Sequence, residues 1–304
     1  MSAGGREVSI RAGAYHGVVT EVGGGLRQLR HGETDLVRTY PADEVRPRYA
    51  GALLAPWPNR VADGAYVFDD ETHQLPLTEP ERGNALHGLV TWDRFEVVDR
   101  SGSSVTLADR LVPRTGYPFE LEITVSYTLH GHEGLRTSVS VRNTGRRAAP
   151  WGTAAHPYLQ AGTDHVDECR LVLPAAEVLE VTPDRLLPVR TAPVDGSGLD
   201  FRGGREIGET FIDHAFAGLV TDDDGLTRVR LTSPSGGGVE CSWDPAVLPW
   251  VQVHTADTPD VATNRTGLAV EPMTCAPDAF NSGQDLVVLP PGGEHTASWS
   301  LRSL

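Results

Sequence analysis

The sequence contains no lysine, and all 26 of its cationic side chains are arginine. A pyridoxal enzyme or a Schiff-base aldolase needs a lysine amine, and a P-loop NTPase needs a lysine for its phosphates. The chain also has no Gly-x-Gly-x-x-Gly between a strand and a helix, no His-Glu-x-x-His and no Gly-x-Ser-x-Gly. These absences exclude several classes of cofactor-dependent and hydrolytic enzymes, and we expect no cofactor.

Cysteine is scarce: Cys169, Cys241 and Cys275 lie far apart, and no Cys-x-x-Cys occurs. An odd, scattered set does not predict a disulfide framework and is typical of a reducing cytoplasm. Residues 1–7 contain no apolar core of a signal peptide, and no later apolar run approaches the length of a membrane span. The sequence therefore predicts a cytoplasmic protein with no membrane partner.

The formal net charge of -15 leaves the chain a net anion. Nucleic-acid binding needs clustered cations against the phosphate backbone, so no nucleic-acid partner is expected. At 304 residues the chain can bury a sizeable core, and large all-β folds of this size often form one unit. No repeat or linker divides it, and the Pro-, Gly- and Asp-rich residues 191–204 are interpreted as a long loop. We expect one domain over 1–304, of unknown oligomeric state.

Period-two alternation of apolar and polar residues dominates the pattern. Residues 119–129 alternate in this way, a Gly-containing turn covers 130–134, and residues 135–141 alternate again. Two long strands around such a turn predict an antiparallel hairpin. Shorter strands are expected at 105–107, 170–173, 228–231 and 251–253. No segment of 12 or more residues has a helical stripe, although short helical turns fit 43–49, so the fold class is all-β, with large antiparallel sheets packed face to face.

Two candidate site segments come early in the chain. Asn59 and Arg60 follow two prolines that stiffen their approach, and a fixed Arg fork can grip hydroxyls or a carboxylate. His87 precedes a glycine among apolar residues, which indicates an imidazole in a tight bend. The alternatives are a surface turn with a solvated Arg and a structural His.

Three more segments place polar groups among apolar or rigid neighbours. His156 is followed by Pro157, which restricts its backbone, and its imidazole can give and take protons near pH 7. Asp213 lies in an apolar segment and needs donors, which adjacent sugar hydroxyls would supply. Glu271 ends an apolar run, where desolvation raises a carboxyl pKa and makes the group a competent base. A buried structural His, a capping Asp and a salt-bridged Glu are the alternatives.

Other patterns carry less information. His130-Gly131-His132-Glu133 resembles a cupin metal motif, but Arg136 and Thr137 stand where the later carboxylate should be. No metal site is therefore expected. The acidic run at 222–224 is interpreted as a solvated loop, and His165 and His214 have no supporting context.

Taken in order, the segments resemble the aldose 1-epimerase (galactose mutarotase) family. The matching pieces are Asn59-Arg60, His87-Gly88, His156-Pro157-Tyr158, Asp213-His214, Val251-Gln252-Val253 and Glu271-Pro272. The resemblance implies a β-sandwich of the supersandwich type with a sugar site in an open groove. It also implies that His156 is the general acid and Glu271 the general base. The implied ligands of the ring and hydroxyl oxygens are Arg60, His87, Asp213 and Gln252, with Asn59 beside them.

The resemblance implies a mutarotase that interconverts the anomers of a free aldose without a cofactor. Its segments look like those of a bacterial subgroup whose substrate is not fixed. An epimerase of an anionic sugar, either sulfonated like sulfoquinovose or a hexose 6-phosphate, is one alternative, and a non-catalytic carbohydrate-binding sandwich is another. Cations that an anionic sugar would need are available at Arg46, Arg48, Arg82 and Arg94, which the sequence does not place.

Overall fold

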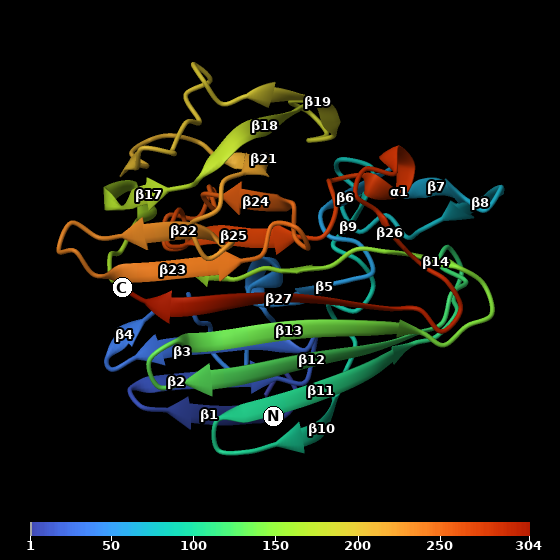
Figure 1. The fold of residues 1–304 in the computed structure, drawn as a ribbon, viewed down its shortest axis with the longest axis horizontal. Helices are drawn as coiled ribbons and strands as arrows, with labels where there is room; N and C mark the ends of the chain where they lie inside the picture. Colours follow the sequence, from blue (N-terminus) through green and yellow to red (C-terminus); the bar gives the residue numbers. More distant parts are fainter. Residues whose placement is uncertain (1) are drawn as a thin grey trace.

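A computed structural model describes residues 2–304 and has three main antiparallel sheets (Figure 1). The largest has nine strands, in the order β10 (Glu96–Arg100), β11 (Ser104–Leu111), β12 (Leu121–His130), β13 (Gly134–Asn143), β27 (Glu294–Ser303), β23 (Gly238–Trp243), β22 (Thr227–Thr232), β17 (Arg170–Val172) and β20 (Arg205–Glu206). The all-β prediction is therefore confirmed. The predicted hairpin is β12–β13, and its alternating apolar side chains are buried along β12 because successive side chains of a strand face opposite ways.

The other two sheets complete the sandwich. One has the order β1 (Glu7–Ala12), β2 (Tyr15–Thr20), β3 (Gly25–His31) and β4 (Thr34–Asp35). The other has the order β16 (Tyr158–Leu159), β25 (Leu268–Met273), β24 (Trp250–His254), β21 (Asp213–Leu219), β18 (Ala175–Val181) and β19 (Pro188–Pro193). Strands β1 and β2 lie against β11 and β12, behind the nine-stranded sheet in Figure 1.

Short strand pairs and helical turns connect the sheets. The pairs are β14 (Ala149–Trp151) with β26 (Val287–Leu289), β5 (Leu53–Leu54) with β15 (Ala154–Ala155), β6 (Arg60–Ala62) with β9 (Asn84–Leu86), and β7 (Ala65–Phe68) with β8 (Glu71–Gln74). The helical segments are the 3-10 turns η1 (Pro47–Tyr49) and η2 (Val166–Glu168) and the helix α1 (Ala279–Ser282). The expected turn near 43–49 is η1. Within residues 2–304, no helix is long and apolar enough to cross a membrane.

One sequence-based boundary was wrong. Residues 191–193, interpreted as the start of a long loop, form the end of β19, which pairs with β18. The two prolines of β19 are tolerated because it is the edge strand of its sheet and its free side needs no hydrogen-bond donors. The four shorter strands predicted from alternation all overlap strands of the structure: β11, β17, β22 and β24.

The six-stranded sheet has one face in the main core and one face outside it. Val251, Val253 and Val270 belong to the same hydrophobic cluster as Val229 and Leu231 of the nine-stranded sheet. Because strand side chains alternate, the residues between them on β24 and β25 must point away from this core.

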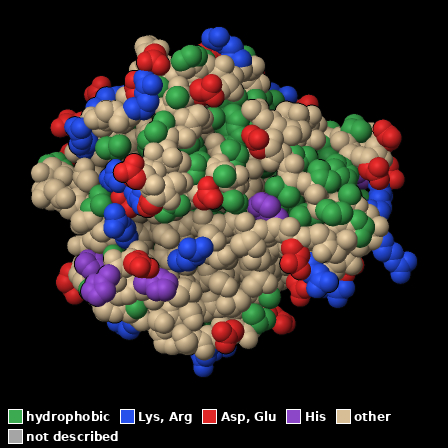
Figure 2. Space-filling view, viewed as in Figure 1, with side chains coloured by type: hydrophobic (Ala, Val, Ile, Leu, Met, Phe, Trp, Pro, Cys, Tyr) green, Lys and Arg blue, Asp and Glu red, His purple; other side chains and the backbone are tan. Residues whose placement is uncertain are grey.

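The nine-stranded sheet has a solvent face of polar side chains. Serine and threonine predominate there on β12, β13 and β27, and this face is the broad tan area in Figure 2.

Candidate active site

A cavity of about 720 Å³ opens on the outer face of the six-stranded sheet, within the range of small-molecule sites. All seven of the candidate site residues line it: Asn59, Arg60, His87, His156, Asp213, Gln252 and Glu271. They are scattered over more than two hundred positions of the chain. The fold therefore brings them to one place.

Strand register explains how three of these residues meet. Glu271 on β25 lies directly opposite Gln252 on β24, and Asp213 on β21 lies opposite His254, two residues further along β24. All four side chains occupy the strand positions that alternate with the core valines, so they share the outer face. The sheet thus presents carboxylate, amide and imidazole groups side by side.

His156 reaches the same place from the segment before β16. Its backbone N–H donates to the Ala52 carbonyl at 3.1 Å, and its carbonyl accepts from the Gly51 N–H at 2.8 Å. The imidazole Nε2 lies 3.2 Å from Oε1 of Glu271, and both side chains are almost completely buried. An acid–base pair is thus held at hydrogen-bond distance on the cavity wall.

Burial shifts the pKa of each member of this pair in the direction that favours its neutral form. Desolvation lowers the pKa of His156 to about 3, with a smaller contribution from His254, and a backbone hydrogen bond opposes the shift. Desolvation also raises the pKa of Glu271 well above its usual range, assisted by Asp213 and opposed by Arg60. Both shifts favour the uncharged arrangement of the pair, in which the imidazole is neutral and the carboxyl keeps its proton.

Several buried polar atoms at the cavity have no partner among residues 2–304. They are Nδ1 of His156, Oε2 of Glu271 and Nδ1 of His87. Buried polar atoms are nearly always hydrogen-bonded, and leaving one unpaired costs about 1–3 kcal/mol. A polyhydroxylated ligand could supply donors and acceptors to all three.

Residues next to the β6–β9 pair form another part of the cavity wall. The Asn59 carbonyl accepts a 2.9 Å hydrogen bond from the His87 N–H, and both residues have left-handed backbones, with φ of 54° and 62°. Gly88 follows with φ of 80°, and a Cβ there would lie 2.0 Å from the Ala55 carbonyl oxygen. The bend after His87 therefore requires glycine. The His87 ring lies 5.3 Å from the ring of His156 and 4.7 Å from that of Tyr49.

Two polar contacts orient the binding candidates. The Gln252 amide donates to Oδ1 of Asp213 at 2.7 Å. Arg60 donates from Nε and Nη2 to the two oxygens of Glu79, at 2.9 and 3.0 Å. Asn59 uses its side-chain oxygen locally, to accept from the Arg60 backbone N–H at 3.0 Å. The Arg60 and Asp213 side chains are thus held in one orientation each at the cavity wall.

The structure also adds residues that sequence reasoning missed. Tyr49, His214, His254 and Asp257 line the cavity, as does Tyr158, which had appeared only as part of a motif. His214 had no supporting context in the sequence, yet it follows Asp213 on β21 and lines the cavity. The period-two spacing of Gln252 and His254 was a usable signal for His254, because it places both on one strand face.

The arginines named for an anionic sugar separate into two groups. Arg48 and Arg82 line the cavity. Arg46 is buried elsewhere and donates to Thr20 and to the carbonyls of Val22 and Thr91, whereas Arg94 is 71% exposed beside Glu21. Across residues 2–304, no group of three His, Cys, Asp or Glu side chains is arranged to hold a metal ion. His130 and His132 lie at the β12–β13 turn, outside the cavity lining.

Comparison with known proteins places this chain in a family. Residues 6–302 match the model of the family described as aldose 1-epimerase. The uncharacterized protein YihR of Escherichia coli K12 is 38% identical over 296 residues, covering 97% of this chain and 92% of that protein. The galactose mutarotase of Homo sapiens is 29% identical over 177 residues, covering 56% of this chain and 50% of that protein.

Solved structures agree on the fold. A GalM/aldose epimerase homologue from C. elegans superposes with a TM-score of 0.85 at 19% identity, over 98% of both chains. A galactose 1-epimerase from Lactobacillus acidophilus superposes with a TM-score of 0.83 at 17% identity, over 98% of this chain and 94% of that one. The chain belongs to the aldose 1-epimerase family. It is an isomerase-type enzyme with sugar epimerase or mutarotase activity in general terms.

Proposed function

We propose that the enzyme interconverts the α and β anomers of a free aldose by opening and reclosing the hemiacetal ring. The observation that carries the proposal is the buried His156–Glu271 pair, 3.2 Å apart on the wall of a cavity that is also lined by Arg60, Asp213 and Gln252. A protein that only binds sugar needs no acid–base pair at this position. The family assignment supports an isomerase over a non-catalytic module.

Anomer exchange requires two proton transfers at one hemiacetal. Glu271 removes the proton from the C1 hydroxyl, and His156 delivers a proton to the ring oxygen. The C1–O5 bond breaks with its electron pair on O5, and the electrons of the O1–H bond form the aldehyde carbonyl. Rotation about C1–C2 followed by the reverse transfers closes the ring on the other face. Positioned acid–base groups contribute roughly 100- to 10,000-fold each to such a step.

The proton count of the pair stays constant in this scheme. Ring opening moves one proton from His156 to Glu271 through the sugar, and ring closure returns it. Burial favours the arrangement with the proton on Glu271, so the ring-opening form is reached by one transfer across the 3.2 Å gap. The pair thus works with a single resident proton and no other co-reactant.

The remaining candidates are proposed as sugar ligands. Arg60 offers Nη1 to a sugar oxygen, because its other two nitrogens are bonded to Glu79. Asp213, oriented by Gln252, accepts from sugar hydroxyls, and His87 contacts the sugar through its free Nδ1. Asn59 contributes mainly by shaping the turn that carries Arg60 and His87.

The test is exchange NMR between the C1 resonances of the two anomers, with and without the protein. We expect catalytic amounts to accelerate exchange of glucose or galactose above the buffer rate at pH 7. No acceleration of any neutral or anionic aldose would overturn the proposed function.

One observation favours a second candidate, an epimerase of a sugar carrying a sulfonate or phosphate. Arg48 lines the cavity and is exposed, and its guanidinium donates only to the Ala256 carbonyl among the described residues, with no acidic partner. An anionic substituent would supply that partner. The discriminating experiment compares glucose with glucose 6-phosphate in wild-type protein and in Arg48→Gln. A lower KM for the phosphate that disappears in the variant supports this candidate, and equal KM values oppose it.

A further inference from the structure

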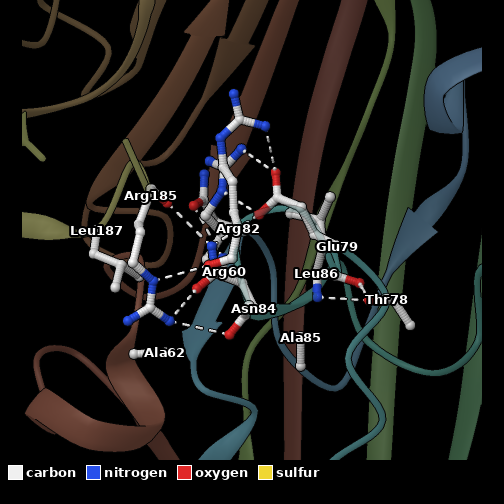
Figure 3. A network of polar contacts seen from close by, with 12 residues as sticks. Arg60, Ala62, Thr78, Glu79, Arg82, Asn84, Ala85, Leu86, Arg185 and Leu187 are labelled. Atoms are coloured by element: carbon white, nitrogen blue, oxygen red, sulfur yellow. Dashed lines mark hydrogen bonds and ion pairs between the residues drawn. The ribbon is translucent and has the colours of Figure 1, made fainter. Parts of the chain in front are cut away.

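The buried Glu79 carboxylate is a junction between the side chains of Arg60, Arg82 and Asn84 (Figure 3). One oxygen, Oε2, accepts from Nε of Arg60 and from the Asn84 amide, both at 2.9 Å. The other, Oε1, accepts from Nη2 of Arg60 at 3.0 Å and from Arg82 at 3.3 Å. The Glu79 side chain is only 5% exposed. A carboxylate this buried is stable when its lone pairs are filled by donors, and here two arginines and one amide fill them.

These bonds fix how Arg60 meets the cavity. Two parallel hydrogen bonds between a guanidinium and a carboxylate define the plane and the rotation of the guanidinium, which a single hydrogen bond does not. The pairing of β6 with β9, in which Arg60 lies opposite Leu86, brings Glu79 and Arg60 together although 19 residues separate them. Nη1 is left as the nitrogen with no protein acceptor among residues 2–304.

Asn84 and Arg185 extend the same network to the loop between β18 and β19. The fully buried Asn84 donates from its amide to the Arg185 carbonyl at 3.0 Å as well as to Glu79. The Arg185 guanidinium in turn donates to the carbonyls of Arg82 and Gly83, at 2.8 and 3.1 Å, and to Asp63 at 2.8 Å. The loop is thereby tied to the turn that carries Glu79.

That loop forms part of the cavity. Pro183 and Leu186 of the loop line it, as does Val181 at the end of β18, and all three are close to Arg185 in the chain. Leu186 has a left-handed backbone, with φ of 54°, so the loop adopts a conformation that external contacts must hold. The orientation of Arg60 and the position of this apolar wall are therefore set by one connected set of hydrogen bonds.

We propose that Glu79, Asn84 and Arg185 form a positioning relay that fixes the Arg60 guanidinium and the 182–187 loop relative to each other around the sugar. In this proposal none of these three side chains contacts the reacting atoms of the sugar. The kinetic test of this inference rests on the proposed function, because it needs an aldose whose anomers the enzyme interconverts. A small displacement of a positioning group can cost on the order of 100-fold in rate, so the relay has a measurable consequence.

The main test is a double-mutant cycle between Glu79→Gln and Arg60→Met, read by kcat and KM on the aldose that the wild type accelerates most. We expect Glu79→Gln to lower kcat/KM by roughly 10- to 100-fold in the wild-type background and by less than about twofold in the Arg60→Met background. Equal losses in the two backgrounds would show that Glu79 does not act through Arg60 and would overturn the relay.

Glu240→Gln is the matched control for stability. Glu240 is also almost fully buried and accepts from Arg230 and Arg302, but it lies on β23, outside the cavity lining. We expect it to change the unfolding midpoint without changing kcat/KM per folded molecule. If Glu79→Gln behaves in the same way, the relay is only structural and the proposal is wrong.

Arg185→Met removes the guanidinium in the 182–187 loop and leaves the two Arg60–Glu79 hydrogen bonds in place. We expect a KM several-fold higher with kcat nearly unchanged, and faster backbone hydrogen exchange over residues 182–187. This exchange readout requires no activity, so it separates failure of the relay from failure of the proposed function. Unchanged exchange in the loop would overturn the relay even in an active enzyme, whereas faster exchange would support it even if no aldose were accelerated.

Discussion

Gln252 and Asp213 are joined by a 2.7 Å hydrogen bond across neighbouring strands, with the amide as donor and Oδ1 of the carboxylate as acceptor. This contact occupies one carboxylate oxygen and leaves the other for a ligand. It also fixes the side chain of Asp213, which comes from β21, relative to Glu271, the neighbour of Gln252 on β25.

Gln252→Met keeps the approximate volume and removes this donor. Hydrogen bonds to charged groups contribute about 1.5–3 kcal/mol, so we expect KM for the aldose to rise at least about tenfold, with a smaller change in kcat. Steady-state kinetics measures both. Gln160→Met is the control, because the Gln160 amide donates to the Thr266 carbonyl at 2.9 Å and lies outside the cavity lining. Identical KM values in the two variants would contradict the role of Gln252.

The buried imidazole of His156 predicts a specific pH dependence of stability. Desolvation lowers its pKa from 6.5 to about 3. Between these two pH values the unfolded chain binds a proton that the folded protein does not. The contribution of the neutral imidazole to the free energy of unfolding is therefore fully present above pH 6.5 and is lost as the pH falls toward 3.

Removing the imidazole should flatten this pH dependence. We expect Glu271→Gln/His156→Asn to lose less stability between pH 6.5 and 4 than Glu271→Gln, by up to about 1.4 kcal/mol per pH unit. The shared Glu271→Gln background removes the titration of the partner carboxyl. Urea unfolding at several pH values gives the free energies, and parallel curves for the two proteins would contradict a depressed imidazole pKa.

The tight bend after His87 leads us to expect that substitution of Gly88 lowers the stability of the fold. Gly88→Ala would place a Cβ 2.0 Å from the Ala55 carbonyl oxygen at a φ of 80°. We expect a loss of about 1–3 kcal/mol or more, since both the clash and the strained backbone act together. Gly102→Ala is the control, because a Cβ there meets nothing within 4 Å and its φ is not positive. Equal unfolding midpoints for the two variants would contradict this account of the bend.

The sequence predicted the long strands better than the site. The alternation of Leu121 to Leu129 is visible locally because one face of β12 is buried and the other is not. The two-residue strands β15 and β16 have no such signal, since their conformation depends on partners far away in the chain. The end of β19 was missed for the same reason: pairing with β18 overrides its prolines and polar residues.

The site residues were found by different routes. Glu271 in its apolar strand indicated a desolvated carboxylate, and the structure buries it. His156 and Asp213 were candidates from their own segments, and the resemblance to a family supplied their implied roles and added Gln252. The register of β21, β24 and β25 brings Asp213, Gln252 and Glu271 together, whereas His156 comes from the segment before β16. Glu79 and Arg185 gave no signal at all: their proposed roles depend on the β6–β9 pairing and on a hydrogen bond between Asn84 and Arg185, which lie 101 positions apart in the chain. Single-domain organisation and the site roles remain predictions.

We propose that His156 and Glu271 share one proton and transfer protons at the sugar C1–O5 unit. The most direct measurement is polarimetry of freshly dissolved α-glucose and α-galactose with wild type, Glu271→Gln and His156→Asn, each normalised to folded protein. We expect wild type to accelerate mutarotation and each variant to lose at least about 100-fold of the catalysed rate at pH 7. If both folded variants retain the wild-type rate, this pair does not perform the proton transfers.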